Sequence, residues 1–350
     1  MKAVKKIFSY KESTLFVIII LLMALITLRN PVFLTFGNMI DILRSGVVLG
    51  IAALGVLVVI NTGGIDVSVG ALIAMVTVVI AHYMLAFAEF FTGLPNIIFI
   101  TSVFLVGLIT GALLGTINGI FVAKLKIPAI VVTLATMSIV NGALRWYTNG
   151  AWITGLPTEF VDIGRIVFFG RPNENDVMIG VPIQVPFLIF AAILTALMLR
   201  YTIVGRGIMA MGGNKISSAR IGFSNDRLTI FAFMYSGLMC GLAGVVYTTI
   251  MRTVDSNAFI GYELRVIGAV VIGGASIKGG SGTVLGTMLG MFLMVVVNNG
   301  LVITHVSTFY QDIIIGAIIL FAVCFDVIKS KRAEQKMAQV EIEEEAVSVS

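Results

Sequence analysis

A glycine pair and an aspartate interrupt a long apolar run near the start of the chain, where residues 61–75 read NTGGIDVSVGALIAM. The hydrocarbon core of a membrane contains no water to hydrogen-bond irregular backbone or to solvate a carboxylate. Both survive at that depth only when they are buried in protein or line a water-filled path. The interruption therefore favours a transport protein.

The composition requires a membrane environment. Of the 350 residues, 58% are hydrophobic and 12% are charged, and the mean hydropathy is +1.06. A soluble protein of this composition would expose more apolar surface than water tolerates. Uncharged runs occupy residues 13–28, 45–65, 67–88, 90–123, 127–144, 177–199, 228–251, 266–277, 279–311 and 313–325. Because a helix crosses the bilayer in roughly 20 residues, we expect an all-α integral membrane protein with about ten transmembrane helices. The run 266–277 is short for a crossing, so we expect that segment to be kinked or extended by its flanking residues.

The distribution of Lys and Arg predicts the orientation, because these residues concentrate in cytoplasmic loops. If the N-terminus is inside and every segment crosses, most of the 23 basic residues fall on the cytoplasmic side. We therefore expect both termini to be cytoplasmic, with an N-terminal segment at 1–12, a transmembrane domain at 13–328 and a tail at 329–350. Within the domain, 148–182 is an external loop or short cap, and 200–227 is an internal loop.

The internal loop ends in GGNKISSARIGFSNDR at residues 212–227. This pattern predicts a short helix from Lys215 to Ile221 with Gly222 as its stop signal. A short basic helix held between two membrane helices is well placed to be pushed by a partner. An ordinary interhelical loop is the alternative.

The sequence contains no catalytic or metal-binding pattern. His82 and His305 are far apart, and neither HExxH nor GxSxG occurs. The segment 207–215 lacks the GK[ST] ending of a phosphate loop, so ATP would have to be hydrolysed by another subunit. The pI of about 9.2 reflects cytoplasmic anchoring residues and gives no reason to expect nucleic acid. A secondary transporter or channel with broken helices is the main alternative, and it is disfavoured because the membrane segments contain almost no ionisable residue besides Asp66. An integral-membrane enzyme is the third class.

Several blocks resemble one family, in order, over roughly residues 35–330. The segment NTGGIDVSVGALIAM is similar to the GGIDLSVGS signature of bacterial ABC-importer permeases of the ribose-type monosaccharide family. Further blocks agree: NGIFVAKLKIPAIVVTLATMSIVNG at 118–142, GRGIMAMGGN at 205–214, GYELRVIGAVVIGGASIKGGSGTVLGT at 261–287, NNGL at 298–301 and STFYQDIIIGAIIL at 307–320.

This resemblance implies a multi-pass permease subunit in the bacterial inner membrane. It implies a cytoplasmic ATPase that binds ATP and Mg, a periplasmic sugar-binding protein, and a dimer with a second permease copy or paralogue. In the family, a helix like EAARLSG docks into the ATPase, and the corresponding residues here are Lys215, Ile216, Ser217, Ser218, Ala219, Arg220, Ile221 and Gly222. The chain departs from that pattern where Ile216, Ser217 and Ser218 replace Glu-Ala-Ala.

The residues expected along the translocation path or its gate are Gly63, Gly64, Asp66, Ser68, Gly273, Gly274, Asn298 and Asn299. Asp66 has two compatible interpretations, as a cap for a helix that begins near Val67 or as part of the path. The glycines at 273–282 repeat the interruption in the second half, as in transporters built from internal repeats. Asn298 and Asn299, with Phe309, Tyr310 and Gln311, could pass a neutral sugar or could be interfacial residues and helix caps.

Overall fold

The computed structural model describes residues 11–321 except 92, 94, 173–177, 308 and 312, and also residue 324. Within this part of the chain, 8 helices are long and apolar enough to cross a membrane. They are α2 (Lys11–Arg29), α3 (Phe36–Asn61), α4 (Val69–Phe87), α5 (Asn96–Lys124), α6 (Ala129–Thr148), α8 (Gln184–Tyr201), α11 (Asn225–Met251) and α13 (Val284–Ile303). The expected all-α membrane fold is confirmed, and the count of about ten crossings stays a prediction.

The remaining elements are short. They are η1 (Pro31–Leu34), η2 (Glu89–Phe91), α7 (Thr158–Val161), η3 (Asp162–Arg165), β1 (Val167–Pro172), β2 (Met178–Pro182), α9 (Ile203–Gly213), α10 (Lys215–Arg220) and α12 (Tyr262–Ile272). With 11 residues, α12 is much shorter than the roughly 20 residues of a full crossing. The expected last segment, 313–325, and the expected termini, 1–12 and 329–350, lie partly or wholly outside the described residues.

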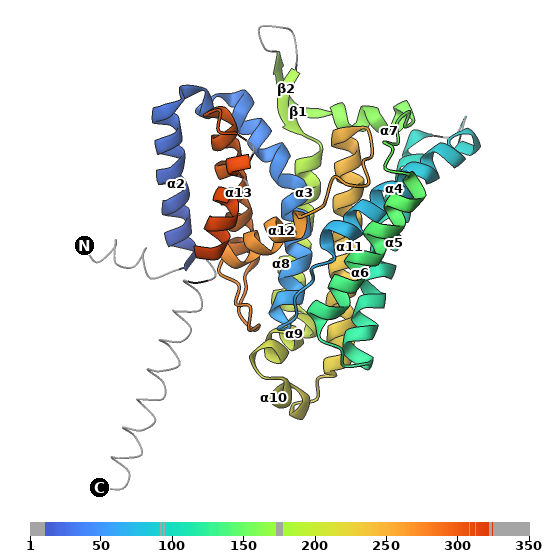
Figure 1. The fold of residues 1–350 in the computed structure, drawn as a ribbon, viewed down its shortest axis with the longest axis vertical. Helices are drawn as coiled ribbons and strands as arrows, with labels where there is room; N and C mark the ends of the chain where they lie inside the picture. The colour runs from blue at the N-terminus through green and yellow to red at the C-terminus, as the bar shows by residue number, and fades with distance from the viewer. Residues whose placement is uncertain are drawn as a thin grey trace.

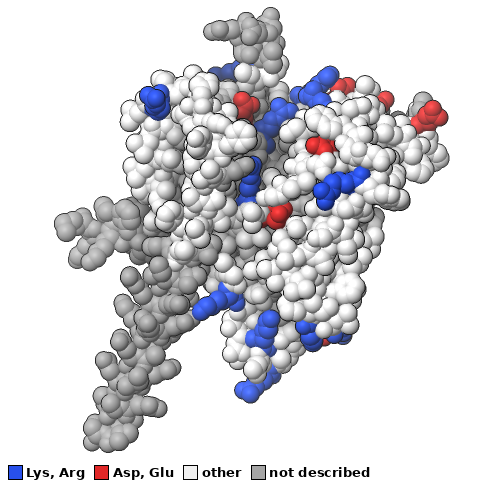
Figure 2. Space-filling view, in the orientation of Figure 1, with Lys and Arg blue, Asp and Glu red and all other residues white. Residues whose placement is uncertain are grey.

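Most of the short elements lie at the two ends of the bundle, whereas α12 lies in its middle (Figure 1). Figure 1 shows α9 and α10 at one end and β1, β2 and α7 at the other. At that second end, the expected loop contains an antiparallel hairpin in which Val167 pairs with Pro182. The uncharged run 177–199 therefore begins in a strand, and its membrane helix starts only at Gln184. Figure 2 shows Lys and Arg side chains with little acidic surface at the α9–α10 end, whereas basic and acidic side chains occur together over the opposite half. The charge rule assigns the α9–α10 end to the cytoplasm.

Direct backbone contact between α5 and α11 builds the centre of the bundle. Glycines recur at every fourth position of α5, at Gly107, Gly111, Gly115 and Gly119. A Cβ atom at Gly111 would overlap the carbonyl oxygen of Gly237 on α11, and one at Gly115 would overlap that of Phe233. Small residues at this spacing let membrane helices approach closely and pack by van der Waals contact.

Substituting Gly111 by Ala tests this packing. The added methyl group has to displace the backbone of α11, and such overpacking typically costs about 1–3 kcal/mol of unfolding free energy. We expect a lower melting temperature for the purified, detergent-solubilised variant. Gly142→Ala on α6 is the matched control, because no atom lies within 4 Å of a Cβ built there. Equal melting of the Gly111→Ala variant and the wild type would contradict the close α5–α11 contact.

Candidate gate and coupling site

The first glycine pair, Gly63 and Gly64, ends helix α3. Gly63 has φ +78, a value that a glycine adopts without strain. Its N–H donates to the carbonyl of Ile60 at 2.8 Å, and the N–H of Gly64 donates to that of Val59 at 3.3 Å. These two bonds form a Schellman motif, which satisfies carbonyl groups that the end of a helix leaves open. The chain therefore leaves the helix at Gly63 with its backbone hydrogen-bonded.

The second half of the chain repeats this helix ending. Gly274 has φ +89 and its N–H donates to the carbonyl of Val271 at 2.8 Å, while the N–H of Ala275 donates to that of Val270 at 3.2 Å. The next helix, α13, begins after Thr283, whose hydroxyl accepts the N–H of Gly286 at 3.0 Å. The expectation of glycine-interrupted segments in both halves is confirmed.

The two interruptions touch each other. The carbonyl of Asn61, at the end of α3, accepts the N–H of Gly280 at 3.0 Å. The side-chain amide of Asn61 donates to the carbonyl of Gly282 at 3.3 Å. A Cβ at Gly63 would lie 3.1 Å from the carbonyl oxygen of Lys278, which is tight. Residues 61–64 and 278–282 therefore form one contact, although more than 200 positions separate them in the sequence.

The end of α9 completes this contact. A Cβ at Gly212 would overlap both the carbonyl oxygen of Asn61 and the amide nitrogen of Gly280. Only backbone therefore fits where α9 meets the two interruptions. We call the contact of Asn61, Gly212 and Gly280 the three-segment junction.

Helix α10 follows the junction almost at once. The side chain of Asn214 caps α10 by accepting the N–H groups of Ile216 and Ser217, both at 2.9 Å. The expected short helix at Lys215–Ile221 is found as Lys215–Arg220, and Gly222 follows it with φ +98. Two residues, Gly213 and Asn214, separate the junction from this helix.

The eight residues expected to contact an ATPase have different surroundings. Ile216 and Ile221 are 66% and 71% exposed. Ser217, Ala219, Arg220 and Gly222 are also exposed. Ser218 is buried, and Lys215 lines a pocket beside the first interruption. Ile216 and Ile221 are the large apolar side chains exposed on this segment, so they are the residues whose apolar surface a docking partner could bury.

Asp66 accepts three hydrogen bonds while it is completely buried. Its Oδ1 atom accepts the N–H of Ser68 at 3.0 Å and the hydroxyl of Ser68 at 2.6 Å. Its Oδ2 atom accepts the hydroxyl of Ser236 on α11 at 2.9 Å. The helix expected near Val67 is α4, which begins at Val69, and Asp66 accepts the N–H of Ser68 just before it, as a cap would.

A chain of polar side chains continues from Ser68 across the bundle. The amide of Asn118 on α5 donates to the hydroxyl of Ser68 at 3.0 Å, and the hydroxyl of Thr136 on α6 donates to Asn118 at 2.6 Å. Together with Ser236, these side chains link α4, α5, α6 and α11. Sequence reasoning missed Asn118, Thr136 and Ser236, although a polar residue inside an apolar run was a usable signal.

The structure places Asn298 and Asn299 on α13 and gives them different surroundings. Asn299 exchanges two amide hydrogen bonds with Asn38 on α3, at 2.8 and 3.0 Å. Asn298 lines a pocket of about 180 Å³ together with Ser45, Tyr262 and Arg265. Neither asparagine belongs to the three-segment junction.

Three further residues considered as sugar contacts lie near the end of the described part of the chain. Phe309 and Tyr310 are exposed, and the side-chain amide of Gln311 donates to the carbonyl of Val306 at 2.8 Å. Within the described part of the chain, no group of three or more His, Cys, Asp or Glu side chains is placed to hold a metal ion.

Comparisons with known proteins match almost the whole chain. Residues 38–323 match the family described as branched-chain amino acid transport system / permease component. The chain is 34% identical to the ribose import permease protein RbsC of Haemophilus influenzae over 316 residues, which cover 90% of this chain and 93% of that protein. The RbsC protein of Bacillus subtilis is 34% identical over 310 residues, covering 89% and 91% of the two chains.

A relative named for another sugar matches at a similar level. The L-arabinose ABC transporter permease protein AraH of Azospirillum brasilense is 32% identical over 318 residues, covering 90% of this chain and 87% of that protein. No solved structure matches the chain. The chain therefore belongs to the family described as branched-chain amino acid transport system / permease component, as the length of the family match and the identity to these relatives show.

Proposed function

We propose that this chain is the permease subunit of an ATP-binding-cassette importer in the bacterial inner membrane. Its solute is a monosaccharide or a similar small polar molecule, as the ribose and arabinose permeases among its relatives suggest. One structural observation carries the proposal. The exposed helix α10 is joined through two residues to a junction that contacts both helix interruptions.

Three partners follow from this proposal. A cytoplasmic ATPase binds ATP and Mg and receives α10, while the permease itself carries no cofactor. A periplasmic binding protein delivers the solute at the β1–β2 end. A second permease copy, or a paralogue, completes the path across the membrane.

The junction supplies the mechanical coupling. When the ATPase displaces α10, Asn214 keeps the start of that helix attached to the end of α9. At Gly212 the backbone packs directly on Asn61 and Gly280, so no flexible side chain absorbs the displacement. Closely packed contacts transmit strain. A movement of α10 therefore shifts both interruptions together, which is how the gate opens.

The solute path runs along the pocket that contains Asn298. Arg265 and Asn298 belong to elements of the membrane bundle, and polar side chains at such positions face protein or water. Hydroxyl, amide, phenol and guanidinium groups suit a polyhydroxylated solute, and Leu49 and Met294 add apolar surface. In the alternative, an ion-coupled secondary transporter, Asp66 is the carboxylate expected to bind the ion. Both oxygens of Asp66 are already hydrogen-bonded.

Reconstitution in proteoliposomes tests the function. Uptake of ribose or another monosaccharide should require ATP, the ATPase and the binding protein, and the purified chain alone should hydrolyse no ATP. The double variant Ile216→Asp, Ile221→Asp should lose co-purification with the ATPase, because two charges replace its exposed apolar contacts. Ile166→Asp, the same change at an exposed isoleucine near the opposite end, is the control and should retain the ATPase. Ion-driven uptake by this chain alone would refute the function.

Substitutions of Asp66 test the role of its hydrogen-bond network. Asp66→Ala leaves three donors without their acceptor, and each buried unsatisfied group costs about 1–3 kcal/mol, so the melting temperature should fall. Asp66→Asn keeps an acceptor for Ser68 and should retain both folding and uptake. Melting and uptake are measured on the same preparations. If the Asn variant melts normally yet fails to transport, the charge itself takes part in the gate and the structural account of Asp66 is wrong.

A further inference from the structure

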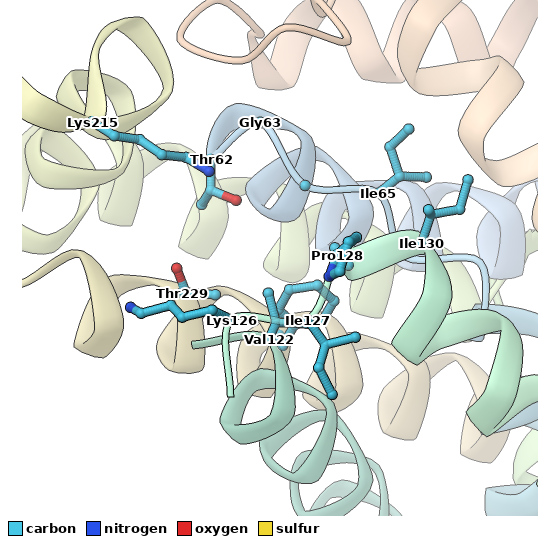
Figure 3. A pocket seen from close by; sticks show the side chains of 13 residues that line it. Thr62, Gly63, Ile65, Val122, Lys126, Ile127, Pro128, Ile130, Lys215 and Thr229 are labelled. Atoms are coloured by element: carbon cyan, nitrogen blue, oxygen red, sulfur yellow. The ribbon is translucent and has the colours of Figure 1, made fainter. Parts of the chain in front are cut away.

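A pocket of about 430 Å³ lies beside the first interruption, at the α9–α10 end of the bundle (Figure 3). Four parts of the chain contribute to its wall: the interruption itself, the α5–α6 connection, the start of α10 and the first turns of α11. The lining residues are Thr62, Gly63, Gly64, Ile65, Val122, Lys126, Ile127, Pro128, Ala129, Ile130, Lys215, Thr229 and Phe233. A ligand here would touch the first interruption directly.

One end of the pocket is polar and basic. Figure 3 shows the side chains of Lys126 and Lys215 ending on the side where Thr62 and Thr229 lie. Lys126 pairs with Asp226. Lys215 makes no ion pair with any residue that the structure describes. The polar end therefore has an excess of positive charge, together with two hydroxyl groups.

Lys124 adds to this positive excess. Its Nζ atom lies 3.9 Å from the carboxylate of Asp226, the same group that pairs with Lys126. The single carboxylate of Asp226 thus faces two ammonium groups, those of Lys124 and Lys126. Lys215 lies across the pocket from them. An anionic group that entered the pocket would meet a net positive field.

The other end of the pocket is apolar. In Figure 3, Ile65 and Ile130 lie away from the ammonium groups of the two lysines. Pro128 lies between the isoleucines and these ammonium groups. Val122 and Ile127 complete this part of the wall. A ligand that fills the whole pocket therefore has an anionic part and a hydrocarbon part.

The pocket also lies where such a ligand is abundant. The neighbouring helices α5 and α6 and the connection between them expose large apolar side chains, among them Phe121, Leu125, Ile130 and Val131. Such side chains belong in contact with lipid, whereas Lys124 and Lys126 mark the boundary with cytoplasmic water. Basic pockets between membrane helices on the cytoplasmic side are suited to anionic lipid headgroups.

We propose that this pocket binds the phosphate of an anionic phospholipid from the cytoplasmic leaflet, with the first part of its acyl chains on the apolar wall. A phospholipid and a free phosphate ion could both place a phosphate between Lys126 and Lys215. Only the lipid also supplies hydrocarbon for the apolar wall. A neutral sugar would leave the ammonium group of Lys215 without an anion. Because Thr62, Gly63, Gly64 and Ile65 form part of the wall, the bound lipid stabilises one position of the first interruption, so lipid composition regulates the gate.

Native mass spectrometry of the delipidated, detergent-solubilised full chain tests the site. The probes are phosphatidylglycerol and phosphatidylcholine with identical acyl chains. The wild type should bind phosphatidylglycerol more tightly, and Lys215→Gln should weaken that binding about fivefold, the effect of one lysine at a membrane surface. Arg220→Gln is the matched control, because it removes the same charge from α10 at an exposed position that does not line the pocket. Melting in phosphatidylcholine verifies that both variants fold.

A second arm separates the lipid from a free anion. Inorganic phosphate at millimolar concentration should neither displace phosphatidylglycerol nor raise the melting temperature, whereas phosphatidylglycerol should raise it in the wild type more than in Lys215→Gln. The proposal is overturned if phosphatidylcholine binds as tightly as phosphatidylglycerol, or if both variants bind phosphatidylglycerol equally. It is also overturned if free phosphate reproduces the stabilisation, which would identify a soluble anion as the ligand.

Discussion

The account depends on one contact, in which the backbones of Asn61, Gly212 and Gly280 meet with no side chain between them. The contact ties the end of α3 to the connection between α12 and α13 and to the end of α9. It is possible because glycine occupies two of the three positions. Asn61 and Gly280 cannot separate without breaking their hydrogen bond, and Gly212 packs directly against both, so a displacement of α9 toward them is transmitted to both segments. The proposed gate and the proposed coupling helix are therefore parts of one mechanical unit.

Ending a helix within an apolar run leaves polar backbone groups without their helical partners, which costs free energy. The chain meets this cost with local solutions. Two helices end in the same Schellman motif, at Gly63 and Gly274, and Asp66 with Ser68 holds the turn before α4. The polar chain through Asn118 and Thr136 then anchors this turn to α5 and α6. The polar chain thus holds the turn at Asp66 and Ser68 to the bundle, whereas residues 61–64 belong to the junction.

The sequence was sufficient to predict the membrane fold, the two interruptions and the short helix after Gly213, because each depends on local patterns of apolar residues and glycines. Contacts between distant segments could not be predicted from such patterns. The pairing of Gly212 with Asn61, and that of Asn299 with Asn38, are facts of tertiary packing. The glycines of α5 were a missed signal, since their four-residue spacing is visible in the sequence. The β1–β2 hairpin was not predicted, because its second strand and α8 lie in the same uncharged run of the sequence.

Electron paramagnetic resonance on the assembled transporter tests the central claim most directly. Spin labels at Ser217 on α10, Lys278 beside the junction and Ser138 on α6 would be introduced in pairs, after Cys240 and Cys324 are replaced. If the junction couples α10 to the interruptions, the distance between labels 217 and 278 stays constant between the nucleotide-free and ATP-bound states, while the distance between labels 217 and 138 changes. A change in the 217–278 distance on ATP binding would contradict the account, because α10 would then move without the junction.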